Sequence, residues 1–453
     1  MRRALFAFLA LAMSAAPAAE KDKSGAKGGI DAKTGEAIDA AIAKGRAWLR
    51  AEAQKEVATP AGTSITHKGP DGKDQTYSFP VGRPALLGLA LLEAGLPPAD
   101  PLLKQIWDKL KSKSPPPTTY DAGVGLLFAE AYLRASNGGR RVTSLDSKDR
   151  DWMQKAADYL ASGCYGGGWT YVCPGGAGYP LGEDPKKKYS IGDQGGGGEG
   201  EDPGAANAEL ERLVSESAAR NATRDHDHSN SQYAVLGLKA ASLCGVKVKN
   251  ARLMWRTVVY HFLKGQEKDG PEVDLKLTRE ESRFKAEDYT MEMEPQKPRA
   301  RGWAYGDGGE AYGSMSAAGM TALIVAQSEV TDLSGDEKHQ ILMAVRDSLA
   351  WFQQNWAMDK NPLSERSGGG MAPAAHYYHL YGVERVGMLT LVRALAGHSW
   401  YKEGADLLLR AQKQDGRWPS ASQGFPEDDR IKTAYALLFL ARSTKSEYAI
   451  GEK

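Results

Sequence analysis

The chain has 453 residues, of which 42% are hydrophobic, and its 58 Lys and Arg residues balance 57 Asp and Glu residues to a net charge of +1. Because this balance provides no basic field, nucleic acids and anionic membrane surfaces are not expected as partners. The chain is also longer than the roughly 250–300 residues at which one compact core stops growing, unless each unit packs only on its neighbours.

The N-terminus has the pattern of a secretory signal peptide. Residues 1–19 combine a basic start, an apolar run and small residues before Glu20. A short N-terminal membrane anchor is the alternative. No later stretch approaches the ~18 apolar residues of a membrane span, so we expect a secreted or periplasmic protein with no integral span after signal removal. Residues 20–33 are predicted to be a disordered segment.

Two kinds of helical pattern alternate along the rest of the chain. One kind is amphipathic, and the other is apolar or aromatic on most sides, as in a buried helix. Amphipathic helices are predicted at about 38–54, 100–113, 148–162, 248–266, 336–357 and 399–414. Buried helices are predicted to begin near residues 83, 120, 229, 312, 376 and 430. The buried helix at 376 is expected to run to about 395, with Gly397 as its left-handed cap.

Three segments interrupt this alternation. A β-hairpin is predicted after the first helix, with its turn at Asp71-Gly72. The glycine-rich, charged residues 174–224 predict a flexible insertion. Residues 271–299 alternate apolar and charged side chains and predict a second insertion, in the form of a surface hairpin. A short tail, 446–453, follows the last helix.

Six helices of each kind in strict alternation predict an all-α fold, an (α/α)6 toroid. Six buried helices would form an inner ring and six amphipathic helices an outer ring. The single domain would cover residues 34–445 and include both insertions. The last inner helix would pack beside the first outer helix and close the circle.

A repeated motif resembles a known family. Residues 412–418, QKQDGRW, are similar to the Q-x-x-D-G-x-W signature of the prenyltransferase and squalene-cyclase repeat proteins. Residues 266–270 are a partial copy, and the segments GGGWTY and RGWAYGDG resemble the glycine–tryptophan half of the motif. The resemblance implies a terpenoid-cyclase-like toroid in which Gln and Asp cap helix ends and Trp packs between helices.

The catalytic groups of that family do not carry over. The nearest match to the D-x-D-D-T-A acid of triterpene cyclases is 427–429, Glu-Asp-Asp, and the Thr-Ala pair follows three residues too late. The sequence contains no Asp-x-Cys, which the zinc site of protein prenyltransferases requires, and the sequence after Cys244 lacks a thioester motif. Since fold similarity does not transmit function, the activity has to be argued from the site.

In a double ring, the starts of the inner helices converge on one mouth of a central cavity. Candidate ligand-binding residues at these starts are Tyr120, Asn230, Gln232, Trp303, Tyr305, Tyr312, His376, Tyr377 and His379. Candidate catalytic residues are Asp121, Asp227, His228, Glu384 and Asp429. Helix capping is the alternative role for the aspartates, and Glu384 is interpreted as a structural ion pair with Arg385.

Three functions compete for this set of residues. Aromatic walls with a few polar anchors predict a cavity that binds a small apolar or amphipathic ligand, or a polypeptide. Asp225, His228, His376 and His379 would instead suit zinc, the one cofactor considered. Facing carboxylates would suit an enzyme of the squalene-cyclase-like or carbohydrate-active kind. Ligand binding is the function we predict, with an enzyme as the alternative.

The three cysteines suit an oxidising compartment. Cys164 and Cys173 bracket a glycine-rich loop and are predicted to form a disulfide, with three reduced cysteines as the alternative. Cys244 follows an apolar helix and is expected to be a buried free thiol.

Overall fold

The computed structural model describes residues 30–58, 63–68, 74–142, 144–164, 166–173, 226–279, 296–367, 375–419 and 427–442. The predicted signal peptide, the first insertion at 174–224 and the tail at 446–453 lie outside the described residues. The segment 20–33 lies mostly outside them. Its last two residues belong to the first helix, so that end of the segment is ordered rather than disordered as predicted.

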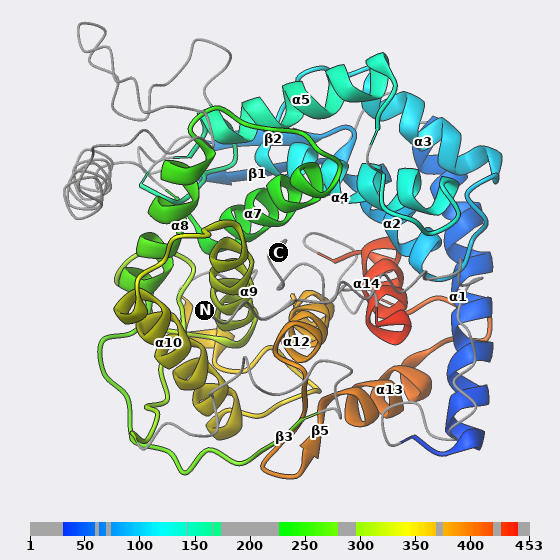
Figure 1. Ribbon diagram of the computed structural model, residues 1–453. Helices are drawn as coiled ribbons and strands as arrows, with labels where there is room; N and C mark the ends of the chain where they lie inside the picture. Colours follow the sequence, from blue (N-terminus) through cyan, green and yellow to red (C-terminus); the bar gives the residue numbers. More distant parts are fainter. Residues whose placement is uncertain are drawn as a thin grey trace, which may run out of the picture.

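Six helices form a closed inner ring (Figure 1). In chain order they are α2 (Gly82–Glu93), α4 (Thr119–Ser136), α7 (His228–Leu243), α9 (Gly313–Glu329), α12 (His376–Thr390) and α14 (Asp429–Ala441). Each helix packs against the next, and α14 packs against α2. Each inner helix begins within one residue of its predicted start.

Six more helices pack outside this ring. They are α1 (Ala32–Ala58), α3 (Pro101–Lys111), α5 (Ser147–Ser162), α8 (Ala251–Gly265), α10 (Gly335–Gln354) and α13 (Trp400–Ala411). Helix α1 packs on both α2 and α14, so the first outer helix bridges the two ends of the inner series. The predicted all-α double ring of six inner and six outer helices is confirmed.

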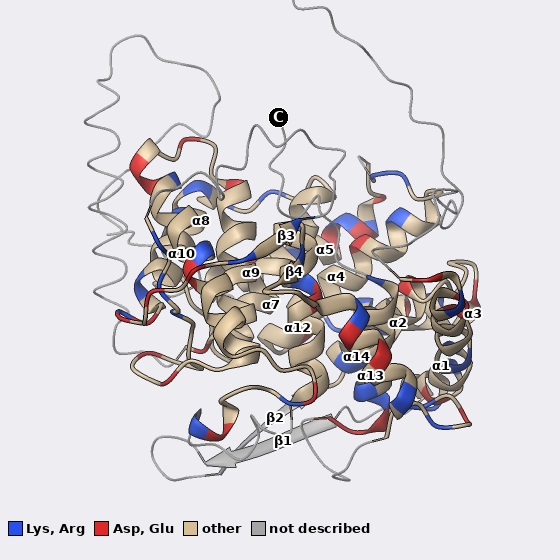
Figure 2. Cartoon of the chain, turned by 90° about the horizontal axis from the view of Figure 1, so that it is seen from below, with Lys and Arg blue, Asp and Glu red and all other residues tan. Residues whose placement is uncertain are grey.

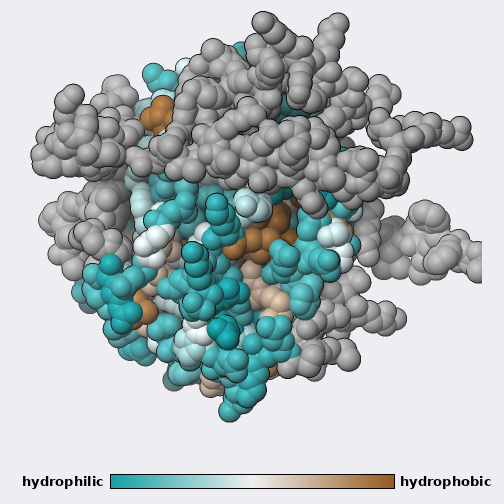
Figure 3. Space-filling view, turned by 90° about the vertical axis from the view of Figure 1, so that its left-hand side faces the viewer, coloured by the Kyte–Doolittle hydropathy of each residue, from teal (hydrophilic) through white to brown (hydrophobic). Residues whose placement is uncertain are grey.

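Burial explains the two kinds of helical pattern. In α9 every residue from Gly313 to Ala326 is buried, so no polar stripe is needed. Charged residues lie mainly on the outer helices and loops (Figure 2), and the described surface on the side of α8 and α10 is largely hydrophilic (Figure 3). Among the described helices, none combines the length and the apolar character that a membrane span requires.

Three tryptophans each link an outer helix to the next inner helix through the same pair of hydrogen bonds. We call these contacts the tryptophan fastenings. The indole N–H of Trp169, Trp303 and Trp418 donates to a carbonyl oxygen near the end of the preceding outer helix. The acceptors are Leu160, Phe262 and Leu408, at 2.7, 2.8 and 2.8 Å. The backbone N–H of each tryptophan donates to a hydroxyl near the start of the next inner helix. These hydroxyls belong to Ser231, Ser316 and Thr433.

Two glutamines link successive outer helices. Gln266, after α8, donates through Nε2 to the carbonyl of Ala344 in α10 at 2.9 Å. Gln412, after α13, donates to the carbonyl of Ala41 in α1 at 2.9 Å, and this contact helps to close the outer ring. The tryptophan contacts agree with the packing role that the resemblance implies, whereas Gln266 and Gln412 donate to carbonyl oxygens within α10 and α1 rather than at helix ends.

The β structure is partly as predicted. Strands β1 (Thr63–Lys68) and β2 (Asp74–Phe79) pair antiparallel, which confirms the two strands of the first hairpin; the residues of its turn lie outside the described ones. The prediction that the helix at 376 continues to 395 is wrong. Helix α12 ends at Thr390, the next residue Leu391 has φ 57°, and β4 (Val392–Leu395) follows.

The ends of the second insertion pair antiparallel through a bridge between Glu272 and Arg299, as in the predicted hairpin, and residues 280–295 lie outside the described ones. Strand β3 (Leu277–Arg279) pairs with β4, and β4 pairs with β5 (His398–Ser399) through a turn at Gly397, where φ is 88°. Gly397 is therefore a hairpin residue and not a helix cap. The strand partner of β3 lies more than a hundred residues further along the chain, so the local pattern at 271–299 could not reveal it.

Candidate functional site

Polar side chains cap the N-termini of five inner helices, and all of these side chains except that of Asp428 are buried. Asp121 accepts N–H bonds from the start of α2, Asp227 from the start of α7, and Glu427 from the start of α12. Asn361 accepts such a bond from α9 and Asp428 from α14. Capping, the alternative considered for the aspartates, therefore describes the hydrogen bonds that Asp121 and Asp227 make.

Three of these capping groups have perturbed acidity. Burial raises the pKa of Asp121 to about 6, that of Asp227 to about 6 and that of Glu427 to about 7, although the amide N–H groups favour the ionised form. Three carboxyl groups at the same end of the inner ring therefore titrate close to neutral pH.

Tyrosine hydroxyls meet across the ring at this end. The Tyr120 hydroxyl lies 2.6 Å from the Ser229 hydroxyl, which lies 2.7 Å from that of Tyr378. Helix α9 separates α7 from α12 in the ring, so the contact between Ser229 and Tyr378 spans the interior. The hydroxyls of Tyr171 and Tyr305 lie 2.9 Å apart, and Tyr305 is exposed.

A second polar layer lies one to two helical turns further in. Arg385 of α12 donates through Nη2 to Oε1 of Gln232 in α7 at 2.8 Å, and the Gln232 amide donates to the Tyr378 hydroxyl. The guanidinium lies 4.2 Å from the ring centre of Tyr381 and 5.9 Å from that of Tyr233. We call this set the axial cluster: Tyr120, Ser229, Gln232, Tyr233, Tyr378, Tyr381, Arg385 and Tyr435.

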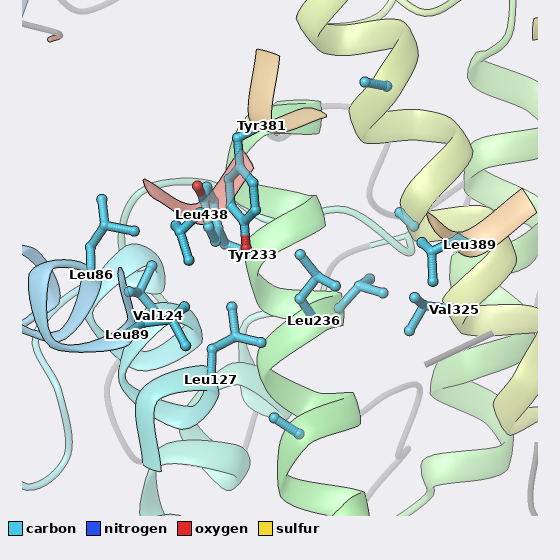
Figure 4. Close-up of a cluster of buried hydrophobic side chains, with 14 of the residues drawn as sticks. Leu86, Leu89, Val124, Leu127, Tyr233, Leu236, Val325, Tyr381, Leu389 and Leu438 are labelled. Carbon is cyan, nitrogen blue, oxygen red and sulfur yellow. The ribbon is translucent and has the colours of Figure 1, made fainter. Parts of the chain in front are cut away.

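Beyond the axial cluster the interior is apolar. Side chains from all six inner helices point toward one another there (Figure 4). This apolar layer consists of Leu86, Leu89, Val124, Leu127, Leu236, Val325, Leu389 and Leu438. Leu236 and Leu389 each follow a member of the axial cluster by one turn on the same helix face, so apolar side chains succeed polar ones along α7 and α12.

The predicted ligand-binding residues divide into two groups. Tyr120, Gln232, Tyr305 and Tyr312 lie in or beside the axial cluster; Tyr312 packs against Tyr378. The others have structural partners. Trp303 belongs to the tryptophan fastening, the Asn230 amide donates to the Asp227 carboxylate at 2.7 Å, and the Tyr377 ring lies under the Lys432 ammonium.

The residues that sequence reasoning missed share one face of α12. Tyr378, Tyr381 and Arg385 are spaced by three and four residues, which places them on the interior face together with Leu389. This spacing is the sequence pattern that could have identified these residues. Glu384, the predicted ion-pair partner of Arg385, attracts its charge, and the group that Arg385 hydrogen-bonds is Gln232 across the ring.

The predicted zinc residues are not brought together. Nε2 of His376 and of His379 contacts the carbonyl oxygen of Met358 and of Ala357, at 2.8 and 3.2 Å. The Nδ1 atom of His228 contacts the Ala304 carbonyl at 2.6 Å, and its ring lies 5.4 Å from that of His261. The two histidines of α12 thus face the connection after α10 rather than α7.

The fourth predicted ligand, Asp225, lies outside the described residues. Within the described parts of the chain, no three His, Cys, Asp or Glu side chains are grouped so that they could hold a metal ion. The expectation that His228, His376 and His379 gather at one rim is therefore wrong, and the side chains that meet at the starts of the inner helices include Tyr120 and Tyr378.

The remaining catalytic candidates have other partners. Asp429 forms an ion pair with Arg417 at 2.6 Å. Glu384 is buried, and its charge contributes to a raised pKa at Tyr401 in outer helix α13. Burial lowers the pKa of His228 to about 4, so that this imidazole is neutral at neutral pH.

The predicted disulfide is not formed. Cys164, Cys173 and Cys244 are buried free thiols. The sulfur of Cys173 lies against Gly163 and is 3.4 Å from the Thr119 hydroxyl, so it has a polar partner in α4. Burial raises the pKa of Cys164 and of Cys173 to about 12, which keeps both thiols protonated.

Comparison with known proteins gives a structural similarity and no sequence relative. No protein-family model matches the sequence, and no curated protein is significantly similar to it. A type II terpene cyclase from Scytonema, solved in complex with its substrate geranylgeranyl dihydroxybenzoate, is similar in structure, with a TM-score of 0.42 and 12% sequence identity. That match covers 92% of this chain and 98% of the cyclase chain.

Proposed function

We propose that the inner ring binds an elongated apolar or amphipathic molecule along its axis and does not transform it chemically. The observation that carries this proposal is the layered interior. Tyrosine hydroxyls lie at the helix starts, Arg385 and Gln232 lie next, and the apolar layer lies beyond them. Apolar walls with a few placed polar groups are typical of small-molecule sites.

The hydrogen bonds and ion pairs of the acidic residues 427–429 support binding rather than cyclisation. Glu427 caps α12, Asp428 caps α14 and pairs with Arg83, and Asp429 pairs with Arg417. A residue that protonates an alkene has to present an O–H to the substrate. These three carboxyl groups are instead occupied by helix amides and guanidinium groups.

A binding titration with pyrene, a neutral apolar fluorophore, tests the proposal. We expect saturable binding with one site per chain. Replacing Leu127 in the apolar layer by Trp should weaken binding by about tenfold or more, a loss of about 1.4 kcal/mol, because the larger side chain occupies the space of the ligand. Leu133→Trp, on another face of the same helix, is the matched control and should keep the affinity. Equal affinities for the two variants would refute the axial site.

An enzyme is the second candidate, favoured by the pKa values near neutrality of Asp227 and Glu427. This candidate would belong to the squalene-cyclase-like or carbohydrate-active kind. Incubation with terpenoid and glycan panels distinguishes it from a binding protein. Turnover that disappears in Asp227→Asn would replace the binding proposal, whereas pyrene binding without turnover supports it.

We further propose that the protein is exported, on the basis of residues 1–19. N-terminal sequencing of protein recovered from separated cell fractions tests this. A mature chain that begins at Ala19 or Glu20 outside the cytoplasm is the expected result. A full-length chain in the membrane fraction would support the anchor alternative instead.

A further inference from the structure

Arg385 is a buried cation that lacks an anionic hydrogen-bond partner among the described residues. The residue is 1% exposed, and the one hydrogen bond found for it goes from Nη2 to the neutral amide of Gln232. Its Nε and Nη1 atoms are buried without a hydrogen-bond partner. A guanidinium carries five N–H donors and cannot lose its charge, so this arrangement leaves donors unused in a dry environment.

The surroundings compensate the charge only in part. The rings of Tyr381 and Tyr233 lie 4.2 and 5.9 Å from the guanidinium, and such cation–π contacts attract the charge but provide no acceptors in the plane of its N–H groups. Withdrawing an ion from water is unfavourable unless its donors are also hydrogen-bonded. Glu384 is the neighbouring carboxylate on the same helix, and its charge attracts the guanidinium, but no hydrogen bond joins the two side chains among those found for Arg385.

Arg385 lies on the interior face of α12, so its unpaired nitrogens lie among the side chains of the axial cluster. The residue shares the interior face of α12 with Tyr378, Tyr381 and Leu389, and it contacts α7 across the ring. The Tyr233 hydroxyl lies 3.2 Å from that of Tyr435 in α14, so phenol groups of α7 and α14 complete the same layer. Leu389 follows Arg385 by one turn, about 6 Å along the helix, and belongs to the apolar layer.

We propose that Arg385 and the phenols around it form a subsite for the carboxylate of a long-chain acid whose hydrocarbon part lies in the apolar layer. This inference rests on the proposed binding function and names the class of its ligand. A carboxylate matches one guanidinium in charge and can accept two parallel N–H bonds. A phosphate monoester carries up to two charges and three acceptor oxygens, which a single guanidinium with two unused nitrogens would leave partly unpaired.

The test compares dodecanoate, dodecanol and dodecyl phosphate as competitors of pyrene on the purified full-length chain. We expect dodecanoate to bind roughly 10- to 100-fold more tightly than dodecanol, which is the range for hydrogen bonds to a charged group. Dodecanoate should also raise the melting temperature of the chain. Equal affinity for the acid and the alcohol would overturn the inference, and tighter binding of the phosphate would overturn the choice of carboxylate.

Variants of Arg385 provide the second arm. Arg385→Met should remove the preference for dodecanoate and keep the binding of dodecanol, and Arg385→Lys should retain part of the preference because the charge remains. Without ligand, Arg385→Met should melt at the same temperature as the original chain or higher, because a buried charge that is only partly compensated is removed. Loss of folded protein in both variants would show that Arg385 is structural and would overturn the inference.

Arg256→Met is the matched control, since Arg256 is a buried arginine of outer helix α8 that is paired with Glu337 and Asp332. This variant should melt at a lower temperature and keep the preference for dodecanoate. A chain that binds neither pyrene nor dodecanol would refute the proposed function itself. A chain that binds both but does not discriminate the acid refutes only the subsite.

Discussion

The tryptophan fastenings and the axial cluster are both buried and polar, but they differ in whether their buried N–H donors have hydrogen-bond partners. Trp169, Trp303 and Trp418 are fully buried, and each has its indole and its backbone N–H paired. In the axial cluster, Arg385 keeps two nitrogens without partners. Buried polar groups that serve stability are paired as a rule. Under the proposed function, the paired tryptophans build the ring, and the unpaired nitrogens of Arg385 would contact the ligand.

The largest effect is expected at a fastening. Trp418→Ala should cost about 3–5 kcal/mol in the free energy of unfolding, because a fully buried indole that packs on Gly45 of α1 is lost together with its bond to Leu408. Urea denaturation followed by circular dichroism measures this loss. Trp356→Ala, at a partly buried site, should cost less. Equal losses would show that the fastening has no special role.

A smaller effect on the free energy of unfolding, which depends on pH, is expected at Asp227, which caps α7. The pKa of Asp227 is about 6 in the folded chain, above its usual 3.8, so the folded state is penalised when this group ionises. The penalty is complete above pH 6 and disappears as the pH falls toward 3.8. Asp227→Asn removes it, so the stability of the variant relative to the original chain should be about 1–2 kcal/mol more favourable at pH 8 than at pH 5.

Asp100→Asn is the control for this measurement. A side-chain bond from Arg50 holds the pKa of Asp100 below its usual value, so Asp100 is ionised in both the folded and the unfolded chain across this pH range. The variant should therefore change the stability equally at pH 5 and pH 8. A pH dependence of the same size in both variants would contradict the assignment of the effect to burial of Asp227.

Tyr378→Phe tests whether the polar part of the axial cluster serves the ligand more than the fold. Loss of the hydroxyl that contacts Ser229 and Gln232 should cost about 1 kcal/mol of stability. It should also change the affinity for dodecanoate, measured by displacement of pyrene. Tyr401→Phe loses one bond, to the Leu440 carbonyl, and should cost a similar amount of stability without altering that affinity.

The smallest effect is expected on the outer surface. Lys104 and Asp108 form an exposed ion pair on α3, one turn apart. Removing both charges should change the free energy of unfolding by less than about 0.5 kcal/mol, because solvent screens exposed pairs. A larger change, measured by the same denaturation, would weaken the argument that stability resides in the buried fastenings.

The sequence predicted the helices well because helix formation is local. The absence of a polar stripe marked each inner helix, and capping residues such as Asp227 and Asp428 marked the starts. Two predictions failed where the partner is distant. Residues 392–395 were predicted to be helical, but they form β4, whose partner β3 lies in the second insertion. The histidines of α12 were predicted to lie near His228, but they contact carbonyl oxygens of the connection after α10.

The sequence by itself therefore determined the number, order and type of the helices, since periodicity and caps are written in neighbouring residues. The tertiary structure alone decided which side chains meet across the ring. Spacing places Tyr378, Tyr381 and Arg385 on one face of α12, but only the rotation of that helix against α7 brings Arg385 to Gln232. Contacts between helices that are not neighbours in the ring depend on the packing of all the others, and no local pattern encodes them.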